Sequence, residues 1–227
     1  MSNQTAMIVN SCFDGKMGFK HYIKAVLGLF KTNIKDLVIL SLLAQLPIMA
    51  LAISGLPAII IQIIGAIVQI IFTVSVLKLI DNRAKGNMIN AIDAIKLFKE
   101  NWIQASGVIL FQSLLLGFGN FIPFLGILMN VFLAVSIPMG VLENRSIMDS
   151  VASSFRLVKG QILDVFAKLL ILSAITSVAL MVLKLILVQV PAALMIVNIV
   201  ISVLMIIPMI AGVVLFYNLP TVKTAKF

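Results

Sequence analysis

Few side chains in this sequence have the type and spacing that catalysis requires. The chain has one cysteine, Cys12, and one histidine, His21. A single cysteine cannot form an intrachain disulfide, and no zinc-ligand spacing can be built from this pair. A serine hydrolase needs a positioned base, but His21 stands alone and suits an interfacial position. No glycine-rich phosphate loop is followed by Lys-Ser or Lys-Thr. We therefore expect no enzyme activity, no metal and no cofactor.

Polar side chains inside apolar runs are the second group with chemical potential. Gln62 and Gln69 share one helix face with Gly65 and Ala66, and Lys184 is the charged residue that falls inside an apolar run. Small and amide-bearing residues commonly hold membrane helices together, and a lysine near a helix end snorkels towards the bilayer surface. We expect packing and snorkelling here. The open alternative is a substrate path lined by Gln62, Gln69 and Lys184.

The remaining polar residues point to packing rather than to ion coupling. Ion-coupled transporters usually need ionisable groups deep in the bilayer, but all eight acidic residues border the apolar runs. Asp164 and Lys168 are four residues apart and are expected to pair on one helix face. Other neutral polar residues fall within the apolar runs: Gln112, Ser113, Asn130, Ser173, Thr176, Ser177, Asn198 and Ser202.

The composition excludes a soluble protein. Of the 227 residues, 62% are hydrophobic and 11% are charged, whereas soluble domains have about 45–50% and about 25%. A soluble fold could not bury so much apolar surface, but lipid can cover it. The net charge of +9 comes from basic residues that border the apolar runs. They therefore suggest contact with anionic headgroups, and we expect no nucleic-acid partner because no basic soluble domain is present.

The apolar runs predict an all-α fold, a polytopic bundle of six transmembrane helices. A spanning helix needs about 20 mostly apolar residues. No signal-peptide core precedes the first run, which we expect to act as an uncleaved anchor. The six spans are expected at residues 34–54, 57–80, 102–118 and 123–142, and within residues 162–190 and 191–217.

Prolines mark the expected turns and bends of the spans. The six runs form three hairpins with very short links, and a proline stands at the start of each second helix: Pro57, Pro123 and Pro191. Proline suits the first turn of a helix, where its missing N–H leaves no hydrogen bond unmade. We expect these prolines at the hairpin tips. Prolines inside the spans predict kinks, at Pro47, Pro138 and Pro208.

The distribution of lysine and arginine predicts the orientation. The segments between the hairpins carry nearly all of the charge, and the tips carry no lysine or arginine. Positively charged residues resist translocation and remain in the cytoplasm. With six spans, both termini are then expected on the cytoplasmic side of the cell membrane.

A threefold repeat is suggested by the stretches before each hairpin. Lys31, Lys99 and Lys159 align, and an amide side chain follows each of them two residues later. Apolar residues precede each lysine at helical spacing. We expect one integral membrane domain over residues 1–227, made of parallel repeats of an interfacial helix and a transmembrane hairpin. The repeats are expected at about 17–80, 86–143 and 146–217, with polar tails at 1–16 and 218–227.

The amphipathic stretches are the expected lipid contacts. A helix with one apolar and one basic face lies flat at the headgroup boundary. The alternative is that these helices are cytoplasmic extensions of spans one, three and five. Candidate residues for binding anionic lipid are Lys24, Lys31, Lys96, Lys99, Arg156 and Lys159.

The third repeat resembles a bacterial family. Residues 141–160 contain Glu143 at the end of a span, followed by Ser154, Leu157, Lys159 and Gly160. This pattern is similar to that of the YciC-like membrane proteins and of the membrane domain fused ahead of some glycerophosphodiester phosphodiesterases. The specific text covers about twenty residues, and the catalytic domain of those enzymes has no counterpart here. The resemblance implies a multi-helix membrane protein linked to lipid or envelope handling.

Two functional classes and a weaker third follow from these patterns. The first is a non-enzymatic protein of the membrane interface, with an accessory, organising or protective role in the envelope and with other membrane proteins as possible partners. The second is a small transporter or permease subunit, and a cavity lined by polar residues would support it. A lipid-modifying enzyme is the third, and the missing catalytic groups argue against it.

Overall fold

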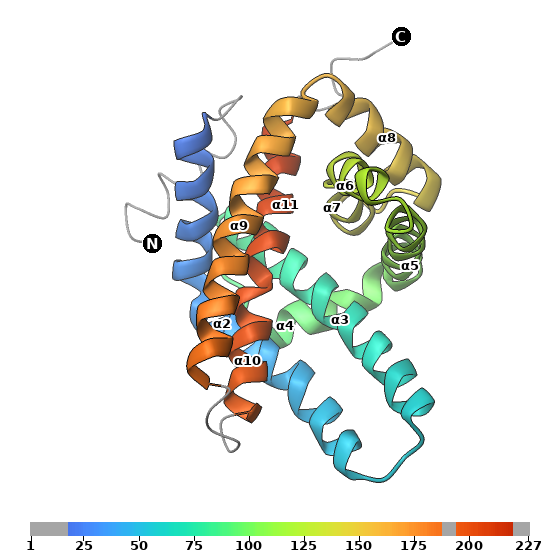
Figure 1. Cartoon of the computed structure of the whole chain (residues 1–227), viewed down its shortest axis with the longest axis vertical. Coiled ribbons are helices and arrows are strands. Elements are labelled where there is room, and N and C mark those ends of the chain that lie inside the picture. Colours follow the sequence, from blue (N-terminus) through green and yellow to red (C-terminus); the bar gives the residue numbers. More distant parts are fainter. Residues whose placement is uncertain (1–17, 188–193, 220–227) are drawn as a thin grey trace.

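Helices account for all regular structure that the computed structural model describes, which covers residues 18–187 and 194–219 (Figure 1). Six helical segments have the length and apolar composition to cross a membrane, which confirms that prediction. The helices are α2 (Phe19–Ile53), α3 (Ala58–Ala84), α4 (Ala91–Lys96) with a 3-10 turn (Leu97–Glu100), α5 (Trp102–Gly119), α6 (Pro123–Phe132), α7 (Ser136–Leu142), α8 (Ile147–Lys159), α9 (Ile162–Leu187), α10 (Leu194–Leu204) and α11 (Ile206–Asn218).

The tips of the first two hairpins form where the tip prolines predict them. Pro57 caps the start of α3, and Pro123 is the first residue of α6. In the first tip Gly55 has φ +72°, a left-handed conformation that a residue without Cβ adopts at little cost. Pro191 and the tip of the third hairpin lie outside the described residues.

Two of the spans are broken in the middle, each at an internal proline. A proline ring clashes with the carbonyl of the residue four positions earlier and cannot donate the hydrogen bond to it. For Pro138 that residue is Ala134, which lies between α6 and α7, and for Pro208 it is Leu204, the last residue of α10. The predicted interruptions are therefore confirmed at these two prolines. Pro47, by contrast, lies inside α2, which continues past it.

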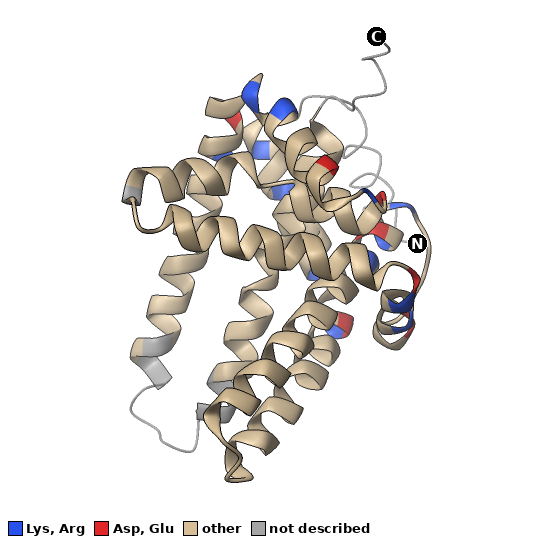
Figure 2. Cartoon of the chain, turned by 90° about the vertical axis from the view of Figure 1, so that its right-hand side faces the viewer, with Lys and Arg blue, Asp and Glu red and all other residues tan. Residues whose placement is uncertain are grey.

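The three hairpins diverge from one another. In Figure 1, α2, α9 and α11 run side by side in the plane of the view, while α5 and α6 are seen nearly end-on. Figure 2, turned by 90°, shows the α5–α6 hairpin lying across the direction of the α9–α10 hairpin. The three repeats are expected to be related by an axis along the membrane normal. This symmetry stays a prediction, because the diverging hairpins do not show it.

Charge is confined to one side of the molecule. Residues 37–77 and 101–142 contain no charged side chain, and residues 169–222 contain only Lys184. In Figure 2 the acidic and basic residues gather at the ends of the helices remote from the hairpin tips. This separation is the one that a lipid environment requires, because a charge in hydrocarbon is costly.

The first amphipathic helix is not a separate element. The prediction of an interfacial helix distinct from the span is therefore wrong for the first repeat. Helix α2 runs unbroken from the basic segment into the span over 35 residues, about 52 Å at 1.5 Å per residue. Within α2, the side chains of Thr32 and Asn33 donate hydrogen bonds to carbonyls of the preceding turn and do not interrupt the helix. The alternative, an extension of span one, describes this repeat.

The second and third amphipathic helices are separate from their spans. Asn101, with φ −145°, leaves the helical conformation before α5, and Gly160 and Gln161 separate α8 from α9. Each of the two helices starts at a side-chain cap, in which Asn90 accepts from the Asp93 N–H and Ser146 accepts from the Asp149 N–H. Such caps satisfy one of the unpaired donors of a helix start and fix the boundary.

The amphipathic helices bury part of their apolar faces against the rest of the protein, and their position at the headgroup boundary stays a prediction. Tyr22 of α2 is fully buried and donates to the Ala211 carbonyl of α11 at 3.3 Å. Phe155 of α8 stacks on Phe132 at 4.7 Å between ring centres. The Ser154 hydroxyl donates to the Phe132 carbonyl at 2.6 Å. These helices therefore cover the charged ends of the spans.

The Ser154 contact predicts a measurable loss of stability. Phe132 is the last residue of α6, so its carbonyl depends on the Ser154 hydroxyl of α8 for a hydrogen bond. Replacing Ser154 with alanine should lower the free energy of unfolding in detergent by about 1–3 kcal/mol. The control is Ser177→Ala, an exposed serine of α9. Equal melting temperatures of the two variants would show that the contact contributes nothing.

Candidate functional site

All of the carboxylates that the structure describes are engaged in ion pairs. Seven acidic residues lie within residues 18–187 and 194–219, and the eighth, Asp14, lies outside them. Their partners are six basic residues, since Arg145 pairs with two of them. The pairs are Asp36–Arg83, Asp81–Lys85, Asp93–Lys96, Glu100–Lys78, Glu143–Arg145, Asp149–Arg145 and Asp164–Lys168.

Asp36 joins three elements at the charged end of the first hairpin. One of its oxygens accepts from Arg83 of α3 at 2.9 Å, and the other accepts from the backbone N–H of Ala91, the first residue of α4, at 3.3 Å. The positive end of the α4 helix dipole also stabilises the negative charge of this carboxylate. Asp36 therefore fixes α4 against the α2–α3 hairpin.

Asp81 joins the first hairpin to the last helix. Its carboxylate is 5% exposed, accepts from Lys85 at 2.7 Å and also accepts the hydroxyl hydrogen of Tyr217. Tyr217 stands near the end of α11, 136 residues away in the sequence. This contact cannot be predicted from the sequence, because no spacing rule relates residues so far apart. The only signal was that both residues end a span.

Lys168 is buried beside its partner, as predicted from the four-residue spacing. Its ammonium lies 2.7 Å from an Asp164 oxygen and 5.5 Å from the centre of the Tyr22 ring. The lysine side chain is 3% exposed, whereas that of Asp164 is half exposed. The carboxylate and the aromatic face together stabilise the buried charge. This arrangement ties α9 to α2.

The cations that remain unpaired are all exposed. Among the described residues whose side chains are placed, seven basic residues have no acidic partner: Lys20, Lys24, Lys31, Lys35, Lys99, Arg156 and Lys159. Five of the six predicted lipid contacts belong to this group. The sixth, Lys96, is exposed but pairs with Asp93 at 3.3 Å.

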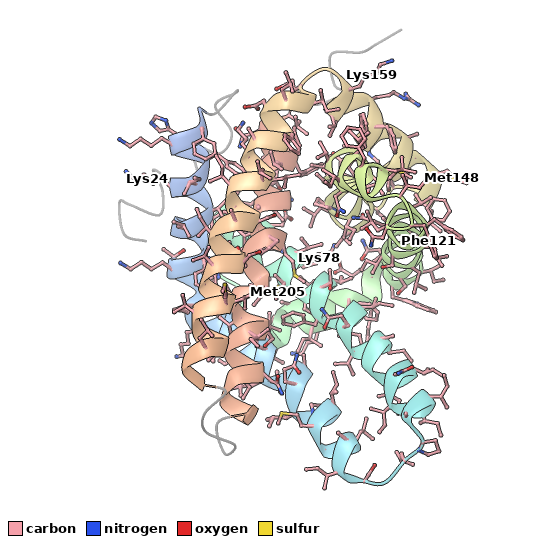
Figure 3. The ribbon with its side chains drawn as sticks, viewed as in Figure 1. Lys24, Lys78, Phe121, Met148, Lys159 and Met205 are labelled. Carbon is pink, nitrogen blue, oxygen red and sulfur yellow. The ribbon has the colours of Figure 1, made fainter. Side chains whose placement is uncertain are left out.

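Four of the unpaired lysines form one stripe on α2. Lys20, Lys24, Lys31 and Lys35 fall within an arc of about 60° at 3.6 residues per turn and extend over about 22 Å. Figure 3 shows Lys24 pointing away from the bundle and Lys159 at the corner between α8 and α9. Beside that corner, Lys159, Gln161 and Asp164 line a hollow of about 550 Å³ that Gly18 closes on the α2 side.

The predicted intramembrane polar face stays a prediction, and two of its three residues lie on the exposed surface of α3. Gln62 and Gln69 are exposed on α3, and their side chains have no hydrogen-bond partner within the described part of the chain. They line neither of the two hollows described here. Lys184 belongs to α9, but its side chain lies outside what the structure describes.

Other polar residues do come together, around a cavity of about 320 Å³. It lies among α3, α5, α6, α7, α9 and α11. Four of its lining residues are polar and uncharged, and each comes from a different helix: Thr73, Gln112, Asn130 and Ser173. The sequence places three of these within apolar runs without relating them, because they belong to three different helices. As for metals, no group of three or more potential ligands comes together within the described ranges.

The buried ammonium of Lys168 predicts unequal effects of removing two carboxylates. Asp164→Asn leaves that ammonium without a counter-charge, which should cost at least about 1–2 kcal/mol of unfolding free energy after allowance for the exposure of Asp164. The matched control is Asp93→Asn, which breaks an exposed pair three residues apart, worth about 0.5 kcal/mol or less. Thermal unfolding in detergent measures both. A larger loss for Asp93→Asn would contradict this account of Lys168.

Comparison with known proteins adds no relative to this description. The similarity of residues 141–160 to the YciC-like proteins stays an expectation, carried by the few residues quoted for it. No protein-family model, no curated protein and no solved structure matches the chain.

Proposed function

We propose that this multi-pass membrane protein binds anionic lipid headgroups at its charged end and serves a non-enzymatic, organising or accessory role in the cell membrane. The observation that supports this proposal is the set of seven exposed cations left after each described carboxylate has found a partner. Unpaired cations beside apolar spans lie where phosphate groups of lipids are found.

The strength of the attraction follows from the number of charges. A lysine or arginine near an anionic leaflet contributes about 1 kcal/mol, and salt screens the interaction over about 10 Å at 0.1 M. Paired cations contribute less, because their carboxylates cancel their field. The stripe on α2, with Lys24 and Lys31, and the group Lys99, Arg156 and Lys159 are therefore the proposed contacts.

The proposed orientation places these cations in the cytoplasm together with both termini. Lysine and arginine are retained on that side during insertion, and the connectors of this chain carry them, whereas the described tips do not. Other membrane proteins are possible partners at the apolar surfaces of the diverging hairpins.

A small transporter or permease subunit is the second candidate. It is favoured by the cavity of about 320 Å³ and by the two proline-broken helices beside it, since interrupted helices line substrate sites in many transporters. No observation on this chain favours a lipid-modifying enzyme.

Neutralising the unpaired cations should reduce the preference for anionic lipid. The variant carries glutamine at Lys24, Lys31, Lys99, Arg156 and Lys159. We expect at least a threefold loss in the association of spin-labelled phosphatidylglycerol, relative to phosphatidylcholine, with the protein in phosphatidylcholine bilayers. Added salt should weaken the wild-type preference as well.

The control for this experiment removes a lysine without changing the net charge. The double variant Lys96→Gln/Asp93→Asn deletes an exposed ion pair on the same face, and it should keep the wild-type preference. An unchanged preference in the five-residue variant would refute the proposal.

The orientation has its own test. In a Cys12→Ser background, cysteines at Asn87 and Asn144, both exposed in connectors, should react with a membrane-impermeant maleimide only when the cytoplasmic side is accessible. A cysteine at Ser54, in the first tip, should react from outside in intact cells. Labelling of either connector from the outside would overturn the topology.

A further inference from the structure

The cavity among the broken helices is partly open, since Asn130 and Ser173 are exposed, and it has the features of a ligand site, independently of the proposed lipid contacts. We propose that it binds a small uncharged molecule, or the uncharged head of a lipid, through hydroxyl or amide groups. The site would be formed by Thr73 of α3, Gln112 of α5, Asn130 of α6 and Ser173 of α9.

The two interrupted spans supply one wall of the cavity. Pro138 and Pro208 both line it, and so does Ala134, whose carbonyl is deprived of its helical donor by Pro138. Gly212 of α11 faces this carbonyl closely, because a Cβ at Gly212 would lie 3.3 Å from the Ala134 oxygen. The backbones of the two broken spans therefore meet at the cavity wall.

The polar side chains have unused hydrogen-bonding capacity. Gln112 accepts the Ser136 hydroxyl hydrogen through its carbonyl oxygen, and its NH₂ group has no partner in the described part of the chain. Asn130 donates to the Gly126 carbonyl at 2.9 Å and keeps its side-chain oxygen unused. Both donors and acceptors are therefore available from different helices.

The two hydroxyl groups add to this set. Thr73 donates to the Gln69 carbonyl at 2.8 Å and can still accept, and Ser173 makes no hydrogen bond with any described residue. An unpaired polar group in a membrane interior is costly, and pairing with a ligand that both donates and accepts removes that cost. Hydroxyl and amide groups have this property.

The lining also limits the charge and the size of the ligand. None of the twelve lining residues is ionisable, so a charged ligand would enter without a counter-charge. A volume of about 320 Å³ is at the small end of ligand-binding cavities. Together these features select a small, neutral, hydrogen-bonding group, and they exclude the anionic headgroups proposed for the charged end.

The test is protection of a cysteine placed in the cavity. Ser173→Cys in a Cys12→Ser background is reconstituted in phosphatidylcholine vesicles and alkylated with N-ethylmaleimide. We expect at least a threefold slower reaction with either 1 M glycerol, which represents a free solute, or 10 mol% dioleoylglycerol, which represents a lipid head. The arm that protects identifies the source. Ser177→Cys, one turn further along α9 and outside the cavity lining, is the matched control and should show no protection.

Two further variants make the outcome decisive. Asn130→Leu, combined with Ser173→Cys, should abolish the protection, while Gln69→Leu on the exposed face of α3 should not. Met209→Cys of α11, another lining residue, replaces the reporter if Ser173→Cys does not fold. Absence of alkylation, equal rates with and without both probes, or equal protection of Ser177→Cys would each overturn the proposal. Loss of phosphatidylglycerol preference in the lipid experiment has no bearing on this result.

Discussion

The exclusion of charge from hydrocarbon is the constraint on which the rest of this structure depends. It confines the described charged side chains to one end, where carboxylates and cations meet at short range. At this end the charged residues also link helices to one another. Asp36 links α2, α3 and α4, and Asp81 links α3 to Tyr217 of α11. These two carboxylates therefore join separate elements at the charged end.

Much of this architecture is predictable from local pattern. Run length gives the six spans, and proline chemistry gives two tips and two breaks, because each depends on a few neighbouring residues. The spacing of Asp164 and Lys168 gives their pair for the same reason. The continuity of α2 is not predictable from the pattern alone, because the side chain of Asn33 bonds to a carbonyl within the helix instead of ending it.

Tertiary arrangement explains what the patterns could not reveal. An amphipathic helix has the same sequence pattern whether its apolar face meets lipid or protein. The burial of Tyr22 against α11 therefore could not be predicted from the neighbouring residues. Gln62 and Gln69 share a helix face in any packing, but only the angle between hairpins decides that this face is exposed. By the same reasoning, Thr73, Gln112 and Ser173 line a common cavity because of the way the three hairpins cross.

The surplus of positive charge has a structural origin that bears on function. Each connector around α4 and α8 carries acidic residues that pair with nearby cations. The first 18 residues of α2, by contrast, carry four lysines and one carboxylate, Asp36, which already pairs with Arg83. The stripe on α2 therefore has no neutralising partner within the described chain. Because the opposite face of this segment is buried against α11, the stripe is held in place rather than free to turn. An anionic leaflet at the level where the span begins would compensate this charge, which is why the stripe is the central contact of the proposed function.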